Sequence, residues 1–473
     1  MSVLSFLDRD HTIAPPGYSR WLVPPAALAV HLCIGQAYSL SVFSLPLSKL
    51  IGIKESVAGQ DWDLTTTVWI FNIAFVFLGL SAALFGKWLE RVGPRKAMFV
   101  SALCFCGGFM VSAVGIYLHT IWLLYLGSGV LGGIGLGLGY ISPVSTLIKW
   151  FPDRPGMATG MAIMGFGGGA LIGSPLADNL MKFYATPTSV GVLQTFVTMG
   201  ILYFVLMMFG VFTVRVPAAD WKPEGYAPPV KNDNAMITTA SVTADEAIKT
   251  PQFYFLWLVL FLNVTAGIGI LAQASPLIQE MFPGRVTAAA AAGFVGLLSL
   301  FNLVGRFFWS SLSDIIGRKY TYMIYLGLGC ALYALVPSLG SAGNLVLFVL
   351  VFCVILSMYG GGFATIPAYL RDMFGTYQVG AIHGRLLTAW SAAAIAGPSI
   401  VTYLRDYQIK SLGVAPKDAY STAIYIMAGL LVAGFICNLL VRPVDPSHYY
   451  KAETAANIPP EPETARVQQG AAV

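Results

Sequence analysis

Charged residues are scarce in this sequence. Asp, Glu, Lys and Arg make up only 10% of its 473 residues, whereas 56% of the residues are hydrophobic. A soluble domain carries about 25% charged residues, so the composition excludes an ordinary soluble protein and predicts an integral membrane protein. The net charge of +5 comes from short basic clusters between apolar runs. It therefore gives no indication of nucleic-acid binding.

Cysteine is also rare, and the six cysteines all lie inside apolar runs. Small buried hydrophobic residues explain them better than disulfides or metal ligands do. We expect neither a metal site nor a cofactor. Residues 1–20 contain acids and a Pro-Pro pair but no apolar core, so they do not resemble a cleavable signal peptide. The first apolar run is then expected to act as the targeting signal.

Long apolar runs, by contrast, are abundant. A membrane-spanning helix needs about 20 mostly apolar residues, and twelve runs meet this condition. They predict helices near 21–48, 65–89, 97–118, 121–149, 156–180, 190–214, 252–280, 287–312, 320–339, 344–369, 380–403 and 420–441. The expected fold is therefore an all-α integral membrane protein.

Polar segments divide these helices into two groups of six. The expected organisation is an N-terminal segment (1–20), a first six-helix bundle (21–215), a linker (216–250), a second bundle (251–441) and a disordered tail (442–473). Most lysines and arginines lie in the loops and tails on one side of the predicted helices. The positive-inside rule places that side, with both termini, in the cytoplasm. We expect a monomeric, multi-pass protein of the plasma (inner) membrane.

The two predicted bundles repeat each other. The shift along the chain that superimposes Glu90 on Asp314 also superimposes Gly93 on Gly317, Pro143 on Pro367, and Gly156, Gly160 and Gly173 on Gly380, Gly384 and Gly397. We call it the repeat shift. Two parallel repeats of this kind are the plan of a large transporter class, in which the substrate site lies between the halves near the middle of the membrane.

Similar acid–glycine–base motifs follow the second and the eighth predicted helix: "GKWLERVGPRK" (residues 86–96) and "SSLSDIIGRK" (residues 310–319). Positive-inside charge alone would explain the basic residues, but it requires neither the acid nor the glycine. With the repeat, these motifs resemble the major facilitator superfamily across nearly the whole chain. The segments "KTPQFYFLWLVLF", "KWFPDRPGMATG" and "GRFFWSSLSD" are similar to its oxalate/formate antiporter branch, which is related to the monocarboxylate transporters.

This resemblance implies a secondary transporter whose acid–base clusters latch the inner gate in the outward-open state. Glu90 stands where the family usually has aspartate. The residues to which the resemblance assigns gating are Gly86, Glu90, Arg91, Gly93, Arg95, Asp314, Gly317, Arg318 and Lys319.

One charge lies deep inside an apolar run. Arg306 is the only charged residue between 288 and 312, and an arginine in hydrocarbon costs about 2.5–3.5 kcal/mol. It could reach the headgroups with its long side chain, but its equivalent in the first repeat is Ala82, so the fold itself does not require a cation there. A guanidinium fork matches a carboxylate. In the resembled branch, the corresponding arginine holds the substrate carboxylate.

The predicted helices contain no central acid that could pair with this arginine. Asn302, one turn before it, is neutral, and Trp390 stands where oxalate-specific carriers have a lysine. One cation and one indole suit a monocarboxylate such as formate, lactate or pyruvate; the alternative is an oxalate or dicarboxylate exchanger. The further candidates for lining the site, each of which also fits ordinary packing, are Tyr38, Gln36, Tyr140, Tyr359 and Phe363.

The coupling of transport stays open at this point. Proton symport would need His31, His383 or the proton of the substrate itself, and His31 could equally be satisfied by a neighbouring helix. We favour anion exchange, or symport in which the empty Arg306 site is the barrier. A transporter-shaped anion sensor is a further alternative. An enzyme is not expected, because the spans contain no nucleophile–base pair and no metal cluster.

Overall fold

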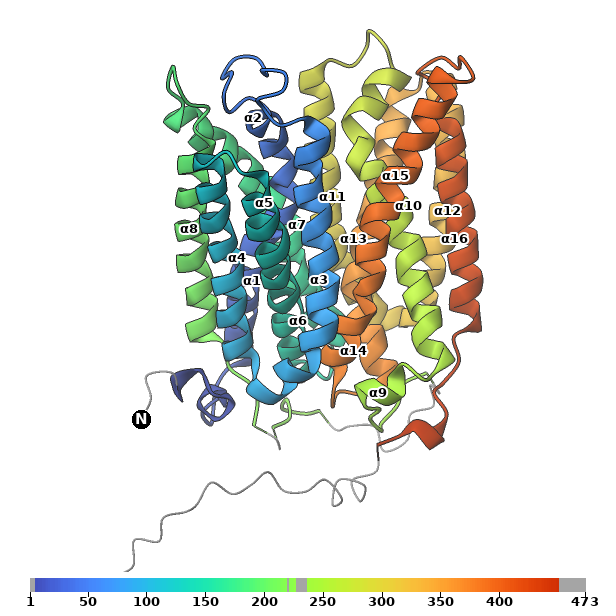
Figure 1. Ribbon diagram of the computed structural model, residues 1–473. Helices are drawn as coiled ribbons and strands as arrows, with labels where there is room; N and C mark the ends of the chain where they lie inside the picture. Colours follow the sequence, from blue (N-terminus) through green and yellow to red (C-terminus); the bar gives the residue numbers. More distant parts are fainter. Residues whose placement is uncertain (1–4, 219–220, 227–235, 451–473) are drawn as a thin grey trace, which may run out of the picture.

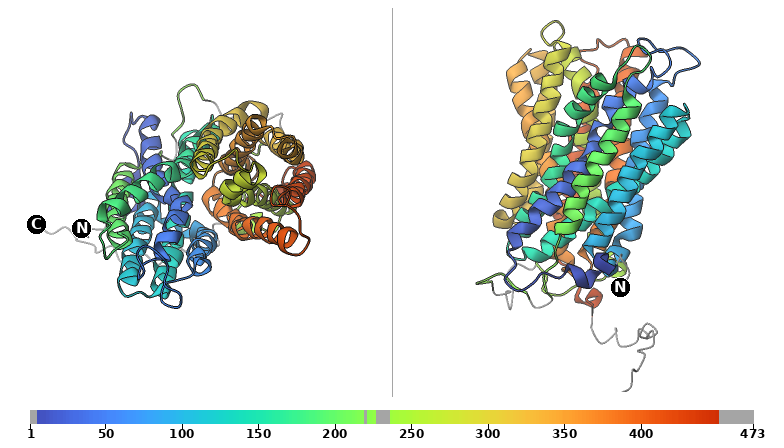
Figure 2. Two further views of the ribbon diagram at one scale, coloured as in Figure 1. Left: turned by 90° about the horizontal axis from the view of Figure 1, so that it is seen from above. Right: turned by 90° about the vertical axis from the view of Figure 1, so that its left-hand side faces the viewer.

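A computed structural model of the protein describes residues 5–218, 221–226 and 236–450. Twelve helical spans in these ranges are long and apolar enough to cross a membrane. They stand side by side in two groups, seen from the side in Figure 1 and along the helix axes in Figure 2. The predicted fold, an all-α membrane protein with two six-helix repeats, is confirmed.

The N-terminal half and the C-terminal half each contribute six spans. The N-terminal half consists of α1 (Val23–Ile34), η4 (Gly35–Phe43), α2 (Ser44–Leu47), α3 (Leu64–Val92), α4 (Pro94–Tyr117), α5 (Ile121–Leu124), η5 (Tyr125–Leu131), α6 (Gly132–Trp150), α7 (Pro155–Tyr184) and α8 (Val192–Thr213). The C-terminal half consists of α10 (Pro251–Met281), α11 (Ala288–Ile316), α12 (Arg318–Ser341), α13 (Leu345–Phe374), α14 (Val379–Leu386), α15 (Thr388–Lys410) and α16 (Ser421–Leu440).

Short helices gather at one end of the bundle, which we call the terminal side. They are η1 (Ser5–Leu7), η2 (Arg9–Thr12), η3 (Arg20–Leu22), α9 (Ala244–Ala247) in the linker and η6 (Pro446–His448). In Figure 1 this is the lower side. The expected disorder of the tail is wrong for residues 442–450, because they fold against the linker: the backbone N–H of Tyr450 donates to the carbonyl of Ser241 at 2.7 Å. The remainder of the tail, 451–473, lies outside the described residues.

Three predicted spans are not single α-helices. The first changes to a 3₁₀-helix at Gly35, where α1 comes so close to α7 that a Cβ atom would lie 3.0 Å from the Cα of Gly169. The fourth contains the π-helical segment η5. The eleventh is interrupted at Leu387 and then runs on to Lys410, beyond the predicted end. Periodicity of apolar residues finds a span but does not report such local changes of winding.

Glycines end α3 and α11 and let the next helix begin at once. Gly93 and Gly317 have φ values of 85° and 88°, a backbone conformation that residues with a side chain rarely adopt. Pro94 and Arg318 then start α4 and α12. Two of the three predicted gating glycines therefore form the tight connections on the terminal side.

Candidate functional site

Arg306 is fully buried on α11, where it faces the N-terminal half. Its Nε donates to Oδ1 of Asn302 at 3.1 Å, and its Nη1 donates to the carbonyl of Ile163 on α7 at 3.3 Å. Its Nη2 has no hydrogen-bond partner among the residues that the structure describes. Within the described part of the chain, no carboxylate pairs with Arg306. Asn302 thus orients the guanidinium, and one N–H-bearing nitrogen stays available.

A glycine on α7 makes room for this side chain. A Cβ atom on Gly167 would lie 2.8 Å from Nε of Arg306 and 3.0 Å from its Cδ. Contacts this short require a neighbour to move, so the approach of Arg306 to α7 depends on the missing side chain. The glycine run of α7 therefore helps to set the position of the cation.

Aromatic rings surround the guanidinium. Its Cζ lies 5.3 Å from the ring centre of Phe363 and 5.8 Å from that of Phe166, within the range of cation–π attraction. Trp390 lies at the centre of this aromatic cluster. The ring centres around it are those of Phe363 (4.5 Å), Tyr140 (5.3 Å), Phe166 (5.3 Å), Phe75 (5.4 Å) and Tyr38 (6.3 Å). Tyr359 packs on Phe363 at 5.3 Å.

The cluster holds several buried polar atoms that have no hydrogen-bond partner in the described ranges of the chain. Besides Nη2 of Arg306, they are the hydroxyls of Tyr38, Tyr140 and Tyr359 and Nε1 of Trp390. A buried unsatisfied polar group costs about 1–3 kcal/mol. All these groups can donate a hydrogen bond, and an arginine adds a positive charge. Chemically, such a set of donors suits a small anion with several acceptor oxygens.

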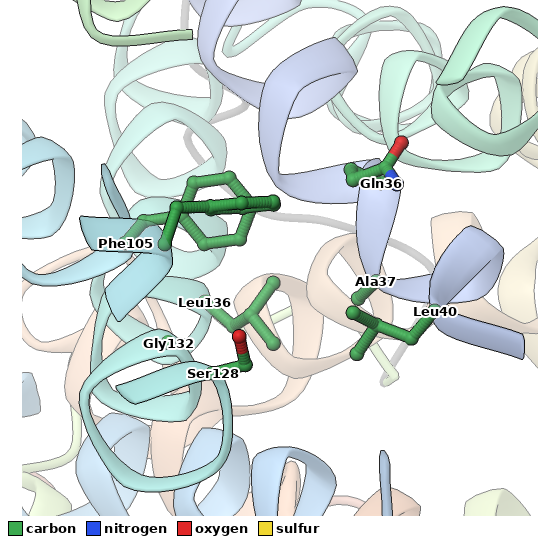
Figure 3. A pocket seen from close by; sticks show the side chains of 8 residues that line it. Gln36, Ala37, Leu40, Phe105, Ser128, Gly132 and Leu136 are labelled. Carbon is green, nitrogen blue, oxygen red and sulfur yellow. The ribbon is translucent and has the colours of Figure 1, made fainter. Parts of the chain in front are cut away.

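Gln36 is not part of this cluster. Its Oε1 accepts a hydrogen bond from the hydroxyl of Tyr203 on α8 at 2.9 Å. Figure 3 shows it at a separate cavity inside the N-terminal half, near Phe105, Ser128 and Leu136. This cavity has a volume of about 10 Å³, which is room for about one water molecule. Gln36 is therefore better explained by packing within its own half.

The two predicted histidines lie next to the aromatic cluster. His31 on α1 stacks on the ring of Tyr140 at 5.2 Å, and His383 on α14 lies 5.8 Å from the same ring. Both histidines are buried. Tyr140 thus stands between an imidazole from each half.

The acids of the two motifs meet the opposite half on the terminal side. Asp314 accepts from the backbone N–H groups of Gly156 and Met157, both at 2.8 Å, where α7 begins. Glu90 accepts from the N–H of Gly380 at 3.1 Å, where α14 begins. The repeat shift makes these contacts equivalent. Each acid therefore faces the positive end of a helix of the other half.

The other predicted gating residues differ in where they lie. Gly86 packs directly on Ala381 of the other half. Arg318 lies against Gly156 of the other half and donates to two acids of its own half, Asp314 at 2.5 Å and Asp372 at 3.0 Å. Three residues do not bridge the halves: Arg95 binds carbonyls of the N-terminal half, Lys319 binds carbonyls after α16, and Arg91 is exposed without an ion pair in the described ranges.

The linker adds a contact that the sequence did not predict. Asp245 of α9 pairs with Lys87 of α3 and, at 2.7 Å, with Arg385 of α14. The hydrogen bonds from Lys87 and Arg385 hold the pKa of this carboxyl below its usual range. One carboxylate of the linker thus contacts both halves. The hydrogen bonds described between the halves lie near the middle of the helices or on the terminal side. The two halves are therefore in contact on the terminal side, and we call this arrangement closed.

Phe166 and Phe75 were missed by sequence reasoning. Phe166 had a signal, since the repeat shift pairs it with Trp390, and the two rings lie in contact. Phe75 carried no comparable signal. It is one of many phenylalanines in the apolar runs, and only the packing of α3 against α15 brings it to the cluster.

Comparisons with known proteins agree with this architecture. The sequence pattern of the Major Facilitator Superfamily matches residues 27–398, with a second match over 285–465. The oxalate:formate antiporter of Oxalobacter formigenes is 25% identical over 90% of this chain and 93% of its own. Apicoplast pyruvate carrier 1 of Toxoplasma gondii is 23% identical (88% and 87%), and mouse monocarboxylate transporter 12 is 23% identical (83% and 81%).

Solved structures share the fold. The fucose:proton symporter of E. coli matches with a TM-score of 0.62 and 14% identity, over 90% of this chain and all of the other. The human organic anion transporter MFSD10 matches with a TM-score of 0.62 and 15% identity, again over 90% and 100%. The resemblance expected from the motifs is thus confirmed. The chain is a multi-pass membrane protein that belongs to the Major Facilitator Superfamily, with relatives among the oxalate:formate antiporters and the monocarboxylate transporters.

Proposed function

We propose that this protein is a secondary active transporter of small organic anions, above all monocarboxylates of the formate, lactate or pyruvate type. The two halves alternate access to a site at Arg306, by anion exchange or by proton symport. The terminal side faces the cytoplasm of a cell whose plasma membrane holds the protein. The observation that carries the proposal is a fully buried arginine without an acidic partner among the described residues.

The electrostatics of burial support an anionic substrate. A lone charge in a low-dielectric interior is costly unless an opposite charge comes close. Asn302 and the carbonyl of Ile163 give Arg306 hydrogen bonds but no negative charge. A carboxylate bound at Nη2 would supply that charge. The names of the relatives, which include carriers of oxalate, formate and pyruvate, agree with this class of substrate.

Trp390 favours a monoanion over a dianion. By the resemblance drawn from the sequence, it takes the place of a lysine of oxalate-specific carriers. It offers an apolar ring with one N–H that has no hydrogen-bond partner among the described residues. A bound dianion would keep one uncompensated charge in the cluster, at a cost of several kcal/mol. The same N–H could instead bind a keto or hydroxyl oxygen next to the carboxylate. The alternative substrate class, oxalate or another dicarboxylate, would have to tolerate the missing cation.

We propose that the gate uses the helix-end contacts of Glu90 and Asp314. Both lie where the halves touch on the terminal side, and Gly86, Gly93 and Gly317 allow the close approach and tight turns there. When the halves rock, these contacts break and the site opens to the cytoplasm.

Transport in proteoliposomes tests the proposal. Uptake of a labelled monocarboxylate is measured with unlabelled formate, lactate, pyruvate or oxalate as competitors. Monocarboxylates should compete best, and Trp390→Lys should shift the preference towards oxalate because it restores a second cation. Trp390→Phe is the matched control, since it keeps a ring and adds no charge.

Two outcomes would contradict the proposal. Strongest competition by oxalate in the wild type would favour the dicarboxylate exchanger. Binding of the anion without any uptake, in either gradient or exchange mode, would favour an anion sensor.

A further inference from the structure

The environment of His31 on α1 indicates a role beyond packing. Its side chain is fully buried. One ring nitrogen, Nε2, lies 3.2 Å from the backbone carbonyl of Tyr140 on α6. The other, Nδ1, is buried without a hydrogen-bond partner in the described chain. A purely structural histidine is expected to satisfy both nitrogens, and this one satisfies only one.

The bonded partner determines which nitrogen carries the hydrogen. A carbonyl oxygen only accepts, so Nε2 of His31 must donate. In the neutral imidazole, Nδ1 then carries a lone pair and no hydrogen. It is a vacant proton acceptor inside the protein.

The surroundings of His31 link this acceptor to the anion site. The ionisable groups near it are Tyr140 of α6, Arg306 of α11 and His383 of α14; α7 contributes the uncharged ring of Phe166. That ring contacts both His31, at 6.4 Å, and the guanidinium of Arg306, at 5.8 Å. No carboxylate of the described residues is recorded beside His31.

A protonated His31 and Arg306 would both lie beside the ring of Phe166, and like charges in a poorly polarisable interior repel each other. With the site empty, Arg306 opposes the arrival of a proton at His31. A carboxylate on Arg306 cancels that repulsion, so the anion and the proton favour each other's binding. Such coupling is reciprocal by thermodynamic necessity.

We propose that Nδ1 of His31 is a proton-binding site that is loaded together with the anion on Arg306, so that one proton accompanies each carboxylate through the carrier. This inference rests on the proposed function and assigns its coupling ion. The proton comes from the solution on the side of entry and is released when the anion leaves Arg306 on the other side. No other group needs to change its charge.

Proteoliposomes containing the full chain and a trapped pH dye test the proposal in two modes. Net uptake is measured with labelled lactate, an acidic outside and no internal anion. Exchange is measured with unlabelled lactate inside and no pH gradient. The wild type should bring in about one proton per lactate, and its apparent affinity should rise by up to about tenfold per unit of falling pH where His31 titrates.

His31→Gln should keep exchange but lose both the proton movement and the pH dependence of the affinity. His11→Gln, which changes an exposed histidine of η2, should behave as the wild type. Proton movement that persists in His31→Gln overturns the proposal, as does lactate exchange in the wild type without proton movement in net uptake. If His31→Gln does not fold, the wild-type measurement can still overturn the proposal, because net uptake of lactate without proton movement contradicts it. Absence of uptake in both modes would instead refute the transport function itself.

Discussion

Neutralising Asp314 should open the terminal side of the protein. In Asp314→Asn, two charge-assisted hydrogen bonds of 2.8 Å to the start of α7 become bonds to a neutral amide. Bonds to a charged group contribute about 1.5–3 kcal/mol, and a charge at a helix N-terminus about 0.3–2 kcal/mol. Because the amide keeps one acceptor oxygen, we expect a net loss of about 2 kcal/mol, or about 30-fold in the ratio of open to closed molecules. Arg318 keeps Asp372 as a partner, so the fold should persist.

Labelling of a single cysteine measures this change. The six native cysteines are replaced, and Ser145→Cys is introduced, because Ser145 is 5% exposed and lies against Gly380 of the other half. The thiol reagent should react about 30-fold faster in the Asp314→Asn background, while transport slows. The matched control is Asp178→Asn, which neutralises a half-exposed acid whose ion pair in the described part of the chain is with Lys182. An unchanged labelling rate together with unchanged transport would refute the latch.

Two further predictions concern the linker and the approach to the central arginine. The pKa of Asp245 is lowered by its basic partners, so its ion pairs stabilise the closed state at any pH above the usual pKa of an aspartate and lose this effect as the pH falls through the lowered pKa. Asp245→Asn should therefore remove the acid-dependent part of the Ser145→Cys labelling rate. At neutral pH it should raise that rate by at most about fivefold, since exposed ion pairs contribute about 0–1 kcal/mol. Gly167→Ala should cost about 1–3 kcal/mol of overpacking against Arg306 and weaken anion binding about tenfold or more. Gly107→Ala, which meets open space, should leave binding unchanged and should not lower thermal stability.

Composition and repetition predicted the architecture because both depend on many residues at once. Twelve apolar runs and a constant repeat shift are long-range regularities, and they correctly predicted that Glu90 and Asp314 are equivalent. The same regularity pairs Phe166 with Trp390, whose rings lie in contact. Local changes of helical winding could not be predicted, because the 3₁₀ segment that begins at Gly35 depends on how α1 packs against α7.

The candidate site was predictable where chemistry singles a residue out. A lone arginine in hydrocarbon is conspicuous, and the aromatic residues that the sequence analysis named as candidates gather around it. Gln36 shows the limit of this reasoning. A polar residue in a span can turn to either side of its helix, and here its amide accepts from Tyr203 inside one half. The role of Asp245 could not be predicted either, because the sequence of the linker indicates only a polar connector and not its contacts with Lys87 and Arg385.

Binding of the anion by purified Arg306 variants tests the central claim most directly. Heat release on titration of a monocarboxylate is compared for the wild type, Arg306→Lys and Arg306→Ala, with oxalate as the competing ligand. The lysine keeps the charge but loses the fork, so its affinity should fall about 10–100-fold, as expected for a lost charged hydrogen bond of about 1.5–3 kcal/mol. The alanine variant should show no binding, and oxalate should compete poorly in the wild type. Wild-type affinity in a folded Arg306→Ala protein would contradict the account.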